Sequence, residues 1–203
     1  HWLPETEFFS GGFINFRKIS TYSEVELEEQ FESHTKQISS PFLKDALQSF
    51  TQQTHAEKEL IVIDGASKDS TLSILQEYQQ HISQQLSEPD KGIYDALNKG
   101  INLAKGDVIG ILHSDDFFAS NEVLSQVAAL FKEDNQLEAV YGDLDYVDRN
   151  DSDKVIRHWI SGDYQYNQLK LGWMPPHPAL FIKKTCFKKF GNYDLKYHSA
   201  ADY

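Results

Sequence analysis

Residues Gly106 to Phe118 read GDVIGILHSDDFF, and this stretch contains the pattern that decides the fold. A turn glycine leads into an apolar run over residues 108–112, which is typical of a strand buried on both faces of a parallel sheet. The run ends just before two adjacent carboxylates, Asp115 and Asp116, and open α/β sheets bind their ligands at the carboxyl ends of their strands. Because neighbouring residues of an extended strand point opposite ways, we expect the two carboxylates to play different roles. Taken alone, the pair is also compatible with a helix cap or an acidic loop.

Strand-like and helix-like segments alternate on both sides of this stretch. Apolar residues fall on one helical face in residues 40–50, 71–82, 93–104 and 121–131, and strands are expected at 60–63 and 138–141. In the second of these helices the expected buried face is Leu72, Leu75, Tyr78 and Ile82. Residues 144–147 and 155–159 flank a polar turn and predict a small antiparallel hairpin. The pattern predicts an α/β fold, in which helices cover both faces of a mostly parallel sheet.

The N-terminal part of the chain gives the weakest signal. The run Ser23-Glu24-Val25-Glu26 matches a capping box and predicts a helix that extends to about His34. No clear strand is visible before Ser40. We therefore expect residues 1–39 to be an N-terminal extension, with residues 40–203 forming one domain.

Composition and charge exclude several classes of protein. The chain has 203 residues and a net charge of −12, which argues against duplex nucleic acid as a partner because phosphate binding needs clustered lysine and arginine. The single cysteine, Cys186, excludes an internal disulfide and fits a reducing compartment. No apolar run approaches 18 residues, so no membrane span is expected. The expected location is the cytoplasm, and peripheral association with an inner membrane is left open.

Acidic residues follow three successive strand-like segments, at Asp64, at Asp90 and at the pair Asp115 and Asp116. Parallel strands end on the same side of a sheet, so the spacing predicts a rim of carboxylates. Such a rim repels itself unless a divalent cation or hydroxyl donors satisfy it. Oxygen ligands favour Mg²⁺ or Mn²⁺, which usually bridge a carboxylate to substrate phosphates. The sequence therefore predicts a site for a metal and a phosphorylated ligand, without a G-x-x-x-x-G-K-[ST], G-x-G-x-x-G or G-x-S-x-G motif.

Four segments together resemble a known family. These are ELIVIDGASKDST from Glu59, SEPDKGIYDALNKGINLAKGDVIGILHSDDFF from Ser87, HPALFIKK from His177 and AADY from Ala200. They are similar to the inverting family-2 glycosyltransferases with the GT-A fold, and most similar to the bacterial exopolysaccharide and O-antigen enzymes. The resemblance runs from about residue 40 to residue 203. It implies transfer of a sugar with inversion, in polysaccharide biosynthesis, from a UDP- or GDP-sugar to a saccharide or a lipid-linked acceptor.

The resemblance also implies roles for the carboxylates on the nucleotide side of the site. Asp64 would hydrogen-bond the nucleobase or the ribose of the nucleotide sugar. Asp90 would hold the nucleoside as well, with Lys91 close to it. Asp115 would face the ribose or the donor sugar.

The same resemblance assigns the metal and the catalytic base. Asp116 would hold Mn²⁺ or Mg²⁺ on the diphosphate, and Asp202 would be the general base that takes the proton from the acceptor hydroxyl. For Asp202 a helix N-cap is the structural alternative. His177 could line the acceptor side, but a histidine that only packs in a core or a turn is the more common case, so it is left out of the catalytic set.

Two departures from the family pattern leave alternatives open. The usual first strand with its T-x-x-Y-N-like end is not recognisable before Ser40, and the chain stops at Tyr203, where the family continues. A truncated, catalytically inactive nucleotide-binding relative is therefore one alternative. A nucleotidyltransferase is another, but it would need a glycine-rich phosphate loop near its first strand, and none is visible.

Overall fold

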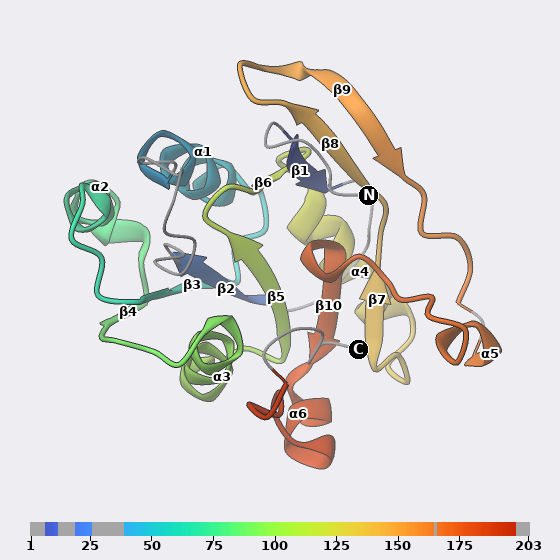
Figure 1. Cartoon of the computed structure of the whole chain (residues 1–203). Coiled ribbons are helices and arrows are strands. Elements are labelled where there is room, and N and C mark those ends of the chain that lie inside the picture. Colours follow the sequence, from blue (N-terminus) through green and yellow to red (C-terminus); the bar gives the residue numbers. More distant parts are fainter. Residues whose placement is uncertain (1–6, 12–18, 26–38, 165, 198–203) are drawn as a thin grey trace.

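The computed structural model describes residues 7–11, 19–25, 39–164 and 166–197, whose strands form two sheets (Figure 1). The larger sheet has the order β4-β3-β2-β5-β10-β7, formed by Gln84–Ser87, Lys58–Asp64, Ile19–Val25, Val108–His113, Leu180–Lys183 and Ala139–Tyr141. The strands β4, β3, β2 and β5 are parallel, whereas β10 is antiparallel to both of its neighbours, β5 and β7. The prediction of a mostly parallel sheet is confirmed.

The smaller sheet has the order β6-β1-β8-β9, formed by Phe117–Phe118, Glu7–Gly11, Leu144–Asp148 and Asp151–Trp159. The antiparallel pair β8–β9 is the predicted hairpin. Strand β6 follows β5 after only three residues, so the turn that carries Asp115 and Asp116 is also the crossing from one sheet to the other. This connection fixes the acidic turn at both of its ends.

Helices cover both faces of the larger sheet, as predicted (Figure 1). Residues of α1 (Ser39–Thr51), α2 (Thr71–Glu77) and α4 (Val123–Glu133) pack on one face, and those of α3 (Ile93–Leu103) and α6 (Lys184–Phe190) pack on the other. The short elements are η1 (Gln79–His81), α5 (Tyr166–Leu169) and η2 (His177–Ala179). Within the described ranges, no helix is long and apolar enough to cross a membrane. The predicted cytoplasmic location stays a prediction.

The two-residue period of the strands explains why both faces are apolar. In β3, Leu60 and Val62 join the core beneath α1, while Ile61 and Ile63 join the core beneath α3. Strand β5 alternates in the same way, with Val108 and Leu112 on the first face and Ile109 and Ile111 on the second. A strand with two apolar faces has no room for polar side chains within the sheet, so its polar residues lie at its end.

The helix predicted from Ser23 is wrong at its start, because Ile19–Val25 is strand β2. A capping box is a local signal, whereas β2 is hydrogen-bonded on both sides, to β3 and to β5, and completes the middle of the sheet. A strand before residue 40 is therefore present where none was recognised. Residues 26–38, which carry the rest of the predicted helix, lie outside the described residues. The division of the chain at residue 40 stays a prediction.

The predicted buried face of the second helix is also partly wrong. Helix α2 ends at Glu77 and buries Thr71, Ile74 and Leu75, while Leu72 is 42% exposed. The helix is rotated so that Thr71, Ile74 and Leu75 face the core, which turns Leu72 outward. Ile82 still packs against the core, but it does so from outside the helix.

Gly110 offers a test of the packing in β5. A Cβ atom at this position would overlap the ring of Phe181, which is 1% exposed in the strand alongside. We expect Gly110→Ala to lower the free energy of unfolding by roughly 1–3 kcal/mol, the usual cost of overpacking a core, as measured by urea denaturation. Adding Phe181→Leu should recover part of that loss. Strictly additive losses in the double variant would contradict this account.

Candidate functional site

Asp64 lies at the carboxyl end of β3 and is fully buried. Its carboxylate accepts the backbone N–H of Ser67 at 3.2 Å and the hydroxyl of Ser87 at 2.5 Å. Ser87 is the register partner of Asp64 in the neighbouring strand β4. The buried carboxylate therefore ties the loop after β3 to the end of β4. The loop directly after β3 turns sharply, because Ala66 has a φ of 67°.

Asp90 lies in the turn after β4 and comes close to the loop that follows Asp64. Its Oδ1 accepts the N–H of Gly92 at 2.9 Å, and a Cβ atom on Gly65 would lie only 2.9 Å from its Oδ2. Within the described part of the chain, this Oδ2 atom is buried without a hydrogen-bond partner. Glycine at position 65 thus allows the two turns to meet.

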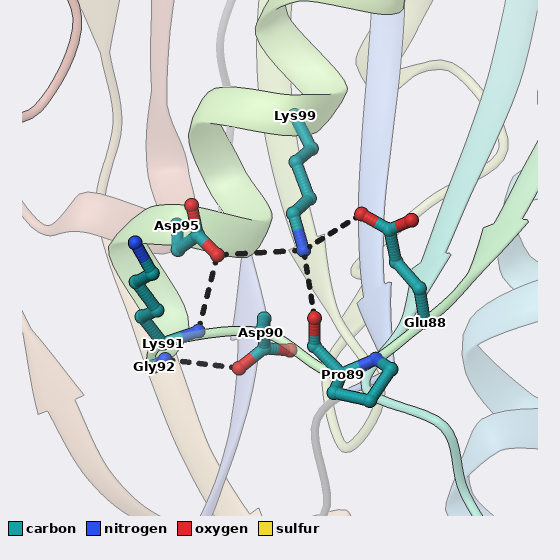
Figure 2. A network of polar contacts seen from close by, with 7 residues as sticks. All are labelled: Glu88, Pro89, Asp90, Lys91, Gly92, Asp95 and Lys99. Atoms are coloured by element: carbon teal, nitrogen blue, oxygen red, sulfur yellow. Dashed lines mark hydrogen bonds and ion pairs between the residues drawn. The ribbon is translucent and has the colours of Figure 1, made fainter.

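Lys99 of α3 holds the turn that carries Asp90, as Figure 2 shows. Its ammonium lies 3.1 Å from Glu88 and 3.4 Å from Asp95, and it donates to the carbonyl of Pro89 at 3.2 Å. The N–H of Lys91 donates to Asp95 at 3.1 Å. The ammonium of Lys91 is exposed and lies apart from the Asp90 carboxylate (Figure 2). These contacts fix the backbone of the turn and leave the Lys91 side chain at the surface.

Asp115 and Asp116 lie in a turn that begins where β5 ends, so the strand is not extended there as the sequence argument assumed. The N–H of Asp116 donates to the carbonyl of His113 at 3.1 Å. Even so, the two carboxylates differ in exposure, because Asp115 is exposed and Asp116 is only 4% exposed, and their different roles stay a prediction. Two adjacent residues thus offer one carboxylate to solvent and one to the interior.

The Asp116 carboxylate has an unfavourable environment. Both of its oxygens are buried, and within the described residues neither accepts a hydrogen bond of ordinary geometry, although a contact with the His113 backbone lowers the pKa of the carboxyl by less than burial raises it. Burial raises the pKa of this carboxyl well above its usual range, and the negative charge of Asp115 raises it further. A buried carboxylate without donors is costly, so it either keeps its proton or is compensated by a bound cation.

The carboxyl ends of the parallel strands do lie on one edge, but the predicted rim has two parts. Asp64 and Asp90 lie together on β3 and β4, and β2 separates them from the Asp115 turn after β5. Two strand spacings correspond to roughly 10 Å. Accordingly, no group of three or more acidic, histidine or cysteine side chains that could hold a metal is found in the described ranges. A metal here would use one or two carboxylates, together with phosphate and water oxygens, which suits Mg²⁺ or Mn²⁺.

The remaining residues considered at the sequence level lie as follows. His177 stacks edge-to-face on His113 with ring centroids 5.7 Å apart, next to the Asp115 turn, and its ring also lies 6.1 Å from that of Tyr193. It packs against these two rings, and its exclusion from the catalytic set stays a prediction. Asp202 lies outside the described residues. The sequence analysis missed Ser87, because the short strand β4 has no apolar run. It also missed the ion pair between Asp95 and Lys99, although the i,i+4 spacing of these residues on a predicted helix could have indicated it.

This arrangement defines the class of protein. A mostly parallel sheet with an antiparallel β10 inside it, and carboxylates at its ligand edge, is the GT-A fold, and solved structures of that fold are similar to it. The S. aureus TarS structure of residues 1–349 aligns with a TM-score of 0.63, 19% identity and 91% coverage of this chain, or 52% of that chain. The mannosyltransferase PcManGT from Pyrobaculum calidifontis, in complex with GDP-Man and Mn²⁺, aligns with a TM-score of 0.60 and 16% identity over 92% of this chain and 50% of that chain.

Sequence comparison identifies the family. The model of glycosyl transferase family 2 matches residues 35–188, and the chain belongs to this family. A PGL/p-HBAD biosynthesis glycosyltransferase of Mycobacterium bovis is 31% identical over 164 residues, which is 79% of this chain and 61% of the relative. The chain thus spans about three-fifths of the length of this relative. The family and the GT-A fold inferred from the sequence are confirmed, whereas the exopolysaccharide or O-antigen type stays a prediction.

The pKa of Asp116 gives a prediction for stability in metal-free buffer. Since the carboxyl binds its proton more tightly in the folded chain, this contribution to stability is full below about pH 4 and is lost as the pH rises through the folded-state pKa. We expect Asp116→Asn to be more stable than the native chain at pH 7, with the difference vanishing at low pH. Urea denaturation between pH 4 and pH 8 in EDTA measures it. Asp153→Asn, which changes an exposed carboxylate, should show no such trend, and parallel curves for Asp116→Asn would contradict the assignment.

Proposed function

We propose that the chain is the donor-binding part of a metal-dependent glycosyltransferase that uses a UDP- or GDP-sugar. The observation that carries the proposal is the set of buried carboxylate oxygens without donors, on Asp90 and on Asp116, at the ligand edge of the sheet. Buried polar atoms normally have a hydrogen-bond partner, and these oxygens have none in the described part of the chain. Hydroxyl groups of a nucleoside would meet it at Asp90, and a cation on a diphosphate would meet it at Asp116.

The nucleoside is assigned to the ends of β3 and β4. Asp90 offers an acceptor oxygen beside the Gly65 turn, and a ribose hydroxyl or a base N–H is the donor that it lacks. Asp64 already accepts hydrogen bonds from Ser67 and Ser87. We therefore propose that it fixes the shape of the nucleoside pocket and accepts one further hydrogen bond from the nucleoside. We propose that the positive charge of Lys91, which is exposed on the same turn, attracts the negatively charged nucleotide.

The diphosphate and the metal are assigned to the end of β5. Asp116 would hold Mn²⁺ or Mg²⁺, and Asp115 would face the ribose or the donor sugar. The printed ligands of two structures with this fold, GDP-Man with Mn²⁺ in PcManGT and UDP in TarS, support a nucleotide and a divalent cation. When bound, the cation would neutralise the charge on the departing nucleoside diphosphate.

The acceptor would approach from the side opposite the leaving group, and Asp202 is proposed to take the proton from its hydroxyl. A base on that face implies a single displacement with inversion at the anomeric carbon. The acceptor class proposed is a saccharide or a lipid-linked saccharide, in polysaccharide synthesis. Both the cytoplasm and the surface of an inner membrane suit such an enzyme.

Metal-dependent binding distinguishes the roles of Asp116 and Asp90. Calorimetry with UDP and with GDP, each with and without Mn²⁺, should show that Asp116→Ala abolishes the gain in affinity that Mn²⁺ gives. Asp90→Asn should keep that gain and lose roughly 1–3 kcal/mol of affinity in both conditions, as when a charged hydrogen-bond partner is removed. Asp153→Asn, which changes an exposed carboxylate of strand β9, is the matched control. An undiminished effect of Mn²⁺ in Asp116→Ala would count decisively against the metal assignment.

Asp202 is tested by separating binding from transfer. Asp202→Asn keeps the shape of the side chain and removes its basicity. It should slow transfer or donor hydrolysis by about 10²–10⁴-fold and leave Mn²⁺-dependent donor binding intact, because a general base acts on the rate. A full rate in Asp202→Asn would exclude the base role. Donor binding without any turnover in the native chain would indicate the catalytically inactive relative instead.

A further inference from the structure

Three aromatic rings meet outside the carboxylate site. Trp173 stacks edge-to-face on Tyr141 at 5.7 Å and on Tyr164 at 6.1 Å between ring centroids. Backbone bonds hold the cluster, since the Tyr141 hydroxyl donates to the carbonyl of Gly162 at 2.9 Å and the Trp173 Nε1–H donates to that of Ser161 at 3.0 Å. Tyr164 is nevertheless 57% exposed. Tyr141 and Trp173 are thus held in place, and Tyr164 beside them is accessible to a ligand.

The strand register places this cluster at the ligand edge of the sheet. Strands β5 and β7 both run antiparallel to β10, so they run parallel to each other, and the carboxyl end of β7 at Tyr141 lies on the same edge as the Asp115 turn. Only β10 separates the two strands. Phe181 pairs with both Gly110 and Val140, so Tyr141 lies level with Ile111, four residues before Asp115 along the strand direction. Asp64 and Asp90 lie in the other direction, beyond β2. In Figure 1 the segment after β9 runs past β7 to α5, on the side away from α2 and β4.

Acidic side chains surround the aromatic rings. Asp143, at the end of β7, accepts the N–H and the hydroxyl of Ser161, and Asp163 is exposed next to Tyr164 in sequence. Burial raises the pKa of the Tyr141 hydroxyl, and the negative charges of Asp163 and Asp143 raise it further, so both carboxylates lie near this ring. Aromatic faces beside carboxylates match the C–H faces and hydroxyl groups of a neutral sugar. The same negative charge disfavours phosphate groups and anionic lipid.

We propose that Tyr164 and Trp173 form a stacking platform for a neutral saccharide, which is the acceptor of the reaction. The inference rests on the proposed glycosyl transfer and adds to it the place and the chemistry of the acceptor. The acceptor sugar stacks its C–H face on the exposed Tyr164 ring and presents a hydroxyl towards the end of β5. Tyr164 and Trp173 bind the acceptor and make no contact with the nucleotide.

Saccharide binding to the isolated chain tests the platform without any donor. The probes are maltose, cellobiose, lactose and methyl α-mannoside, each observed by saturation-transfer NMR at millimolar concentration. We expect at least one probe to bind the native chain, Tyr164→Ala to weaken its Kd at least tenfold, and Tyr164→Phe to keep the native Kd because it keeps the ring. Phe190→Ala removes a ring that is 71% exposed on α6, at the opposite edge, and should bind as the native chain does.

Two results would overturn the platform: no probe binds the native chain, or Tyr164→Ala binds as tightly as the native chain while its thermal melting is unchanged. Hydrolysis of UDP- and GDP-sugars with Mn²⁺, measured on the native chain in parallel, reports on the proposed function separately. Hydrolysis without saccharide binding would leave the glycosyltransferase assignment standing and remove the platform. Saccharide binding through Tyr164 without hydrolysis would retain the platform as a sugar site and remove the catalytic assignment.

Discussion

The hydrogen bonding of β5 on both of its sides is the constraint on which the rest of the structure depends. β2 pairs with it in parallel and β10 pairs with it antiparallel, so β5 lies within the sheet, and both of its faces are covered by helices. Polar side chains are therefore excluded from its length and collect at its carboxyl end. That end is also where the chain crosses to the smaller sheet through β6. The acidic turn is therefore flanked on both sides by strands, β5 and β6.

The buried carboxylates at this edge differ in how they are compensated. Asp64 is fully buried, but it accepts a backbone N–H and a serine hydroxyl, so its charge is stabilised within the protein. Asp116 is nearly as buried, and burial together with the negative charge of Asp115 raises the pKa of its carboxyl. This contrast separates a carboxylate whose oxygens accept hydrogen bonds within the fold from one proposed to bind a cation.

The ligand edge also has two sides with different chemistry. Towards β4, the turn around Asp90 is fixed by the ion pairs of Lys99 and supplies carboxylate acceptors. Towards β7, the cluster of Tyr141, Tyr164 and Trp173 supplies aromatic faces. The acidic turn of β5 lies between the two sides. A two-substrate reaction needs such an arrangement, because donor and acceptor must meet at one point while being recognised by different groups.

The sequence by itself determined the alternation of helices and strands, the buried run of β5 and the carboxylates at strand ends, because these follow from local periodicity and from short motifs. It did not reveal β2, whose strand state depends on two neighbours that are distant in sequence and outweighs a local helix-cap signal. It also did not reveal that Ser87 bonds Asp64, that β2 divides the carboxylate rim, or that Tyr141 and Trp173 meet. Those contacts depend on strand order and register, and only the tertiary structure decides them.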